Sequence, residues 1–256
     1  MRMQQSPCGM SCWGNIWSVA KRELSGTVSS PVAYVFVVIF LLLSAFFTFM
    51  IGGFFERGQA SLASFFAWHP WLYLFLVPAV GMRMWAEERR SGTIELLLTL
   101  PVTAGQAILG KFLAYLIIIA VALVLTFPVW LTVNYLGAPD NGIIFAGYIG
   151  SLLLGASYLA VTSFTSALTR NQVVSFIVAV VICLFLILCG WPPVLNLLNR
   201  VFSPGVVDFV AAFSVMTHFD NIQRGVLDLR DLLFFSSVIL FFLFATQAVL
   251  RARRAG

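Results

Sequence analysis

Six long apolar stretches limit what this chain can fold into more than any other feature. They cover residues 32–52, 66–86, 106–136, 143–168, 173–191 and 232–250. A helix needs roughly 20 mainly apolar residues to cross a bilayer, and each stretch is about that long or longer. With 61% hydrophobic and 10% charged residues, the chain is unlike soluble globular proteins, in which about 25% of residues are charged. The sequence predicts an all-α polytopic membrane protein with six transmembrane helices.

The charged residues are divided unequally between the two sides that six spans define. Eleven of the 15 Lys and Arg residues, with four acidic residues, fall on the side that holds both chain ends. Loops that carry excess positive charge stay in the cytoplasm. We therefore expect a multi-pass protein of the bacterial cytoplasmic (inner) membrane with both termini cytoplasmic. The basic residues are dispersed among loops and form no single stripe, so we expect no nucleic-acid partner.

Residues 1–12 are predicted to form a disordered tail and residues 13–256 a single transmembrane domain. From Trp13 to Val28, apolar residues recur every three or four positions, and Lys21 and Arg22 lie elsewhere around the helix. This pattern predicts an amphipathic helix at the membrane surface, with Trp13 and Trp17 on its apolar side. Ser30 and Pro31 then end it and start the first span. The alternative interpretation is a plain membrane anchor.

A polar interval between the second and third apolar stretches runs from Arg83 to Lys111. Its many charges must lie in water at the bilayer surface, where another protein can reach them. We interpret it as a docking element. Gly92 and Pro101 bracket about two helical turns, which predict a short amphipathic helix along the membrane surface. Its apolar face holds Ile94, Leu97 and Leu98, while Glu95 points elsewhere.

Thr103 and Gln106 have the spacing of a capping box, which predicts the start of the third span. Just beyond, Gly105 to Lys111 has the G-x-x-x-x-G-K spacing of a phosphate-binding loop. Phe112 replaces the expected Ser or Thr, and no strand precedes the segment, so we expect no nucleotide to bind this chain. Cys8 and Cys12 are spaced like metal ligands, but no His or third Cys is near. We expect neither a metal nor a cofactor here.

The fourth stretch is rich in small and hydroxyl residues, which let helices approach closely. These residues are Gly147, Gly150, Ser151, Gly155, Ala156, Ser157, Ser163 and Ser166. They favour a central helix, although their hydroxyls could instead line a polar translocation path. His69 is expected as a hydrogen-bonded residue at the outer interface. Residues 192–231 are broken by prolines and predict two or three short outer helices.

The polar interval also resembles the signature of the ABC type-2 exporter permeases. Seventeen positions are in register, and Gln106 departs from the acid expected there. The matching residues are Pro78, Met82, Arg83, Ala86, Glu87, Glu88, Arg89, Arg90, Gly92, Thr93, Glu95, Leu96, Leu100, Pro101, Val102, Gly110 and Lys111. Within that superfamily the chain is most similar to the gliding-motility branch, which includes the permease of the nitrous-oxide reductase maturation system. Residues His218 to Asp231 are similar to that branch's own signature.

The resemblance implies a single permease domain with no enzymatic activity of its own. A separate ABC ATPase, two subunits per complex, would hold ATP and Mg²⁺ and dock on the polar interval. The second half would be an identical permease chain or a paralogue, and a periplasmic or membrane accessory protein can join the complex. The coupling residues implied are Glu87, Glu88, Arg89, Gly92, Thr93, Ile94, Glu95, Leu97 and Leu98.

The resemblance also implies an elbow helix before the first span, with Trp13, Trp17, Lys21 and Arg22 as its residues. The region between spans five and six corresponds to the outer gate of these exporters. The gate candidates are Asn196, Asn199, Asp208 and Phe213. Two other classes stay open, a non-transporting membrane scaffold or anchor subunit and a membrane enzyme. The chain carries no catalytic motif that would favour the enzyme.

Overall fold

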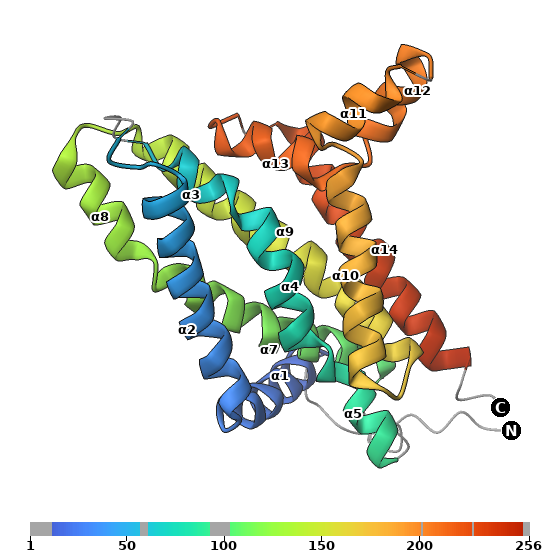
Figure 1. Ribbon diagram of the computed structural model, residues 1–256. Helices are drawn as coiled ribbons and strands as arrows, with labels where there is room; N and C mark the ends of the chain where they lie inside the picture. Colours follow the sequence, from blue (N-terminus) through green and yellow to red (C-terminus); the bar gives the residue numbers. More distant parts are fainter. Residues whose placement is uncertain (1–11, 57–60, 93–102, 201, 227, 253–256) are drawn as a thin grey trace, which may run out of the picture.

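The computed structural model describes residues 12–56, 61–92, 103–200, 202–226 and 228–252, and every regular element in these ranges is a helix (Figure 1). The all-α prediction is therefore confirmed for them. Residues 1–11 of the predicted tail and the predicted helix between Gly92 and Pro101 lie outside the described residues. The elements are α1 (Cys12–Val28), α2 (Pro31–Phe46), the π-helix η1 (Phe47–Ile51), α3 (Ala63–Ala67), α4 (His69–Gly81), α5 (Arg83–Ser91), α7 (Ala104–Val124), α8 (Phe127–Leu136), α9 (Asn141–Leu168), α10 (Gln172–Leu188), α11 (Pro192–Leu198), α12 (Pro204–Ala211), α13 (Val215–Gln223) and α14 (Leu229–Ala252).

Within the described ranges, four helical segments are long and apolar enough to cross a membrane. They are Pro31–Ile51, Ala104–Leu136, Asn141–Leu168 and Leu229–Ala252. Helices α10 and α11 make a fifth if this pair, bent by 67°, counts as one broken span. The predicted second span falls on α3, α4 and α5, which are interrupted at Trp68 and Met82. The protein is thus a multi-pass membrane protein, and the count of six spans stays a prediction.

Several helix starts follow from local chemistry. The Thr103 hydroxyl accepts a hydrogen bond from the Gln106 N–H at 3.3 Å, and the Gln106 side chain accepts one from the Thr103 N–H at 3.0 Å. The predicted capping box is therefore confirmed. Ser30 caps α2, with Pro31 at its first position, and Asp140 caps α9 through the N–H groups of its first turn.

Helix α9 crosses the middle of the bundle (Figure 1) and packs against α4, α5, α7, α10, α13 and α14. Glycines make these close contacts possible. A β-carbon at Gly147 would lie 2.4 Å from the Phe66 ring, and one at Gly150 would lie 2.7 Å from Ile222. The prediction that the fourth stretch is central to the bundle is confirmed.

The predicted amphipathic pattern of α1 is present, and the structure adds which of its apolar residues pack against the protein. Ile16, Val19 and Ala20 are buried, whereas Trp13 and Trp17 are 71% and 57% exposed. Helix α1 packs mainly on α7, so its indoles point away from the bundle. Periodicity alone finds apolar residues and cannot tell a lipid-facing stripe from a protein-facing one.

His69 is enclosed by protein and makes the expected hydrogen bond, whereas its position at the outer interface stays a prediction. The ring is fully buried among the rings of Phe40, Phe65, Phe66 and Tyr73. Its Nδ1 lies 2.9 Å from the Phe65 carbonyl oxygen, while its Nε2 has no hydrogen-bond partner. Phe65, Phe66 and Tyr73 lie about one helical turn from His69 along the chain, and Phe40 comes from another helix.

Candidate functional site

Helix α5 carries the first half of the predicted docking element. It follows α4 after a break at Met82 and ends at Gly92, whose φ of 73° is left-handed and therefore suits glycine. Met84, Trp85 and Ala86 are buried, and Glu87 and Arg90 are exposed. Helix α5 thus has one face packed in the protein and one face open.

The buried face of α5 is held by the hydroxyl groups of α9. Ser166 accepts hydrogen bonds from the N–H groups of Trp85 and Ala86, each at 3.0 Å, and donates to the Met82 carbonyl at 2.9 Å. The Trp85 indole donates to the Ser163 hydroxyl at 3.1 Å. Ser166 thus satisfies backbone groups beside the break at Met82, and Ser163 satisfies the Trp85 indole. Both serines are fully buried in a helix contact, which favours the packing role over a translocation path for these two residues.

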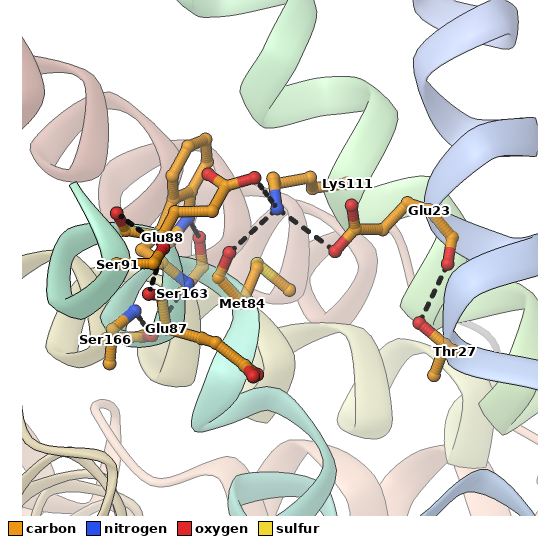
Figure 2. Close-up of polar contacts among 11 residues, drawn as sticks. Glu23, Thr27, Met84, Glu87, Glu88, Ser91, Lys111, Ser163 and Ser166 are labelled. Atoms are coloured by element: carbon orange, nitrogen blue, oxygen red, sulfur yellow. Dashed lines mark hydrogen bonds and ion pairs between the residues drawn. The ribbon is translucent and has the colours of Figure 1, made fainter. Parts of the chain in front are cut away.

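Lys111 joins three elements that are distant in the sequence (Figure 2). Its ammonium lies 3.0 Å from the Glu23 carboxylate of α1, 2.9 Å from the Glu88 carboxylate of α5, and 2.9 Å from the Met84 carbonyl. These three acceptors match the three protons of the ammonium group. The Lys111 side chain is 2% exposed and the two carboxylates are 17% and 20% exposed. We call Lys111, Glu23, Glu88 and Met84 the lysine network.

The residues with the phosphate-loop spacing have other roles in the structure. Gly110 lies inside α7, where backbone N–H groups bond within the helix instead of surrounding an anion, and Gly105 lies in the first turn, next to the Thr103–Gln106 capping box. Lys111 is buried and occupied by carboxylates. Gly110 has a packing role, because a β-carbon there would lie 2.8 Å from Val19 of α1.

The predicted coupling residues are only partly described. Glu87, Glu88, Arg89 and Gly92 belong to α5 or its end, whereas Thr93, Ile94, Glu95, Leu97 and Leu98 lie outside the described residues. Glu88 turns inward to Lys111, while Glu87 is exposed (Figure 2). Arg89 donates a hydrogen bond to the Ala167 carbonyl at 2.5 Å. Of these described charges, Glu87 is therefore the one most accessible to a partner.

The predicted gate residues lie at the other end of the molecule from α5 (Figure 1). Asn196, Asn199, Asp208 and Phe213 are all exposed, on or next to α11 and α12, which project from the bundle. Asp208 also lines a cavity of about 350 Å³.

That cavity is lined as well by a buried pair that the sequence did not predict. His218 Nδ1 lies 2.5 Å from an Asp231 oxygen, and its Nε2 lies 3.2 Å from the Ala212 carbonyl oxygen. The Phe234 ring stacks on the imidazole at 4.0 Å. The pair joins α13 to the first turn of α14, thirteen positions later.

Comparison with known proteins identifies the family. The profile described as "ABC-2 family transporter protein" matches residues 72–253, which include α5, α9 and most of α4. The chain belongs to the ABC-2 transporter family. This ABC-2 permease is 31% identical over 158 residues to the "Probable ABC transporter permease protein NosY" of Pseudomonas aeruginosa. The match covers 57% of this chain and 57% of the relative.

The ABC-2 profile begins after α1 and α2, so it does not include Glu23. The sequence analysis also did not single out Glu23 as a site residue, although the sequence contains one indication of its role. Glu23 is the only acidic residue among the first 55 positions, and Lys111 lies within an apolar stretch, where a charge needs a partner. Pairing them required the fold, since no local pattern links the two positions.

Proposed function

We propose that this ABC-2 permease is the membrane-spanning subunit of an ATP-driven exporter. It would move a substrate, whose identity is open, by alternating access across six spans, with both termini in the cytoplasm. A separate ATPase, two subunits per complex, would bind ATP and Mg²⁺. The other permease half would be a second copy or a paralogue. A periplasmic or membrane accessory protein could join the complex.

One observation carries this proposal: the exposed, charged α5 is fixed to three other helices. It contacts α7 and α1 through Lys111 and α9 through Ser163 and Ser166. Residues 93–102 follow α5 directly. A partner that moves this segment therefore acts on a rigid junction, and the displacement passes into the bundle instead of being absorbed by a loop.

The docking prediction is tested with the tagged full chain purified from host membranes together with its ATPase. Leu97→Asp places a charge on the predicted apolar contact face, where an unpaired buried charge costs several kcal/mol. This variant should insert normally, yet fail to retain or stimulate the ATPase. Glu87→Gln should weaken assembly modestly and in a salt-dependent way, because an exposed charge mainly sets encounter rate and register.

Arg170→Gln is the matched control, since Arg170 is exposed in the turn between α9 and α10. We expect normal ATPase retention and turnover from it. Coupling that survives Leu97→Asp but is lost with Arg170→Gln would assign docking to the other turn. A scaffold subunit, the second candidate, would retain partners without any nucleotide-dependent change in protease cleavage of the exposed α11–α12 region.

A further inference from the structure

A small polar notch lies between α1, the start of α2, α5 and α7. Its volume is about 230 Å³, and Arg22, Arg83, Glu87 and the lysine network contribute its charges. Glu23 and Glu88 already accept from Lys111. Glu87 is exposed, so water and salt screen its charge. In the part of the chain that the structure describes, Arg83, which is partly buried, and Arg22, which is exposed, are the cations of the notch that form no ion pair with a carboxylate.

Of these two residues, Arg83 gives the stronger indication of a bound ligand. Its Nε is buried and has no hydrogen-bond partner. Among the described residues, neither Arg83 nor Arg22 forms an ion pair. A buried donor on a charged group costs free energy when it is left unpaired. A guanidinium presents its donors in a planar fork that matches the oxygens of a phosphate group.

The position of the notch relative to the bilayer indicates which phosphate-bearing molecule could reach it. Ser30 and Val32 line it, which places it where α2 begins and where a first span would leave the headgroup layer. One and two turns beyond Val32 on the same face of α2, Val35 and Ile39 are exposed, an apolar wall suited to acyl chains. Unpaired cations lie below that wall. Basic pockets between membrane helices are known to take lipid headgroups in this arrangement.

We propose that this notch binds the phosphate of a phospholipid headgroup, with Arg22 and Arg83 as its ligands. The inference uses the proposed position of α1 at the membrane surface and does not depend on ATPase docking. A lipid held there would contact the elbow helix, the first span and α5 together. It would thereby make the docking junction sensitive to membrane composition.

The test uses the purified full chain in detergent, without ATPase. The probes are dioctanoyl-phosphatidylglycerol, dioctanoylglycerol, which lacks phosphate, and inorganic phosphate. Binding is counted by native mass spectrometry and by the shift in thermal midpoint. We expect the phospholipid to bind and stabilise the parent, and Arg83→Gln or Arg22→Gln to weaken binding roughly tenfold, as expected for losing a hydrogen bond to a charged group.

Two controls separate the notch from general charge effects. Arg90→Gln and Lys21→Gln remove exposed cations from the same two helices, at positions outside the notch lining, and should bind like the parent. Gly26→Leu keeps both arginines but fills the notch, because a β-carbon at Gly26 meets nothing within 4 Å. It should fold normally and lose the lipid.

Three results would overturn the proposal. If Arg90→Gln and Lys21→Gln lose as much lipid affinity as the notch variants, the lipid binds through nonspecific charge attraction. Equal binding of dioctanoylglycerol would mean that the phosphate is not recognised. Equal stabilisation by inorganic phosphate would mean a free-anion site and no lipid site. Failure of ATPase docking would leave all of these measurements unaffected, so the two proposals fail separately.

Discussion

The ammonium of Lys111 and the carboxylate of Glu23 lie 3.0 Å apart, although 88 positions separate them in the sequence. This contact fixes the amphipathic helix α1 to α7. The same ammonium holds Glu88 of α5, so one side chain positions the elbow helix relative to the docking element. Removing either carboxylate would loosen one of these two attachments.

Lys111→Met should destabilise the protein by about 3 kcal/mol, because it leaves two largely buried carboxylates without their cation. Unfolding in mixed detergent micelles with increasing SDS gives the free energy. The triple variant Lys111→Met, Glu23→Gln, Glu88→Gln removes all three charges and should recover most of the loss. If the single variant is as stable as the parent, the lysine network contributes nothing to stability.

Gly110→Ala should force α1 away from α7. The new β-carbon would lie 2.8 Å from Val19 and 2.9 Å from the Ile16 carbonyl oxygen, and such crowding costs about 1–3 kcal/mol. Gly105→Ala is the control in the same helix, since its β-carbon would be at an ordinary 3.5 Å from Gln247. We expect the control to be neutral or slightly stabilising in the same unfolding measurement. Equal effects at both glycines would contradict the close approach of α1.

Ser166→Ala should cost about 2 kcal/mol, because the N–H groups of Trp85 and Ala86 lose a buried acceptor. It should also weaken ATPase stimulation, since α5 loses one of its attachments to α9. Ser157 is equally buried but bonds only to the Leu153 carbonyl of its own helix, so Ser157→Ala is the matched control. A loss of stability without any loss of stimulation would separate the two roles.

Features set by neighbouring residues could be predicted from the sequence, and features set by packing could not. The capping box of Thr103 and Gln106 was predictable because its partners are three positions apart. The exposed side of α1 was not, because lipid and protein interior both accept Trp17. The enclosure of His69 was not predictable for a related reason, since it depends on Phe40 from another helix. The polar interval that includes α5 was recognisable from its charges, but the attachment of α5 to Ser166 depends on tertiary structure.

Six spans with both ends cytoplasmic predict a clear reporter result. A reporter active only in the cytoplasm should work when fused after Gly256 and stay silent when inserted between Pro139 and Asp140, just before α9. The charge distribution is the reason, since basic residues gather on the side of the chain ends. Activity at the internal position, or silence at the C-terminus, would overturn this topology.

Asp220 should make stability depend on pH. Burial raises the pKa of its carboxyl, with Arg224 opposing the shift. The folded protein therefore holds this proton more tightly than the unfolded chain does. The free energy of unfolding consequently decreases as pH rises through the folded pKa, where the buried carboxyl loses its proton. At neutral pH, Asp220→Asn should be at least as stable as the parent. The difference in free energy of unfolding between the variant and the parent should vanish in acid, below the unfolded pKa of about 3.9. A gap that stays constant with pH would point to the hydrogen bond with Gln223 instead.

The central position of α9 has a consequence for biogenesis. During synthesis α4, α5 and α7 emerge first, and their polar groups then lack partners that only α9 supplies. These include the Trp85 and Ala86 N–H groups, which need Ser166, and the Tyr73 hydroxyl, which pairs with Ser151 at 3.0 Å. Unsatisfied polar groups are costly in lipid. We expect nascent chains that stop before residue 141 to be held by insertion factors or degraded, and chains that include α9 to escape both fates.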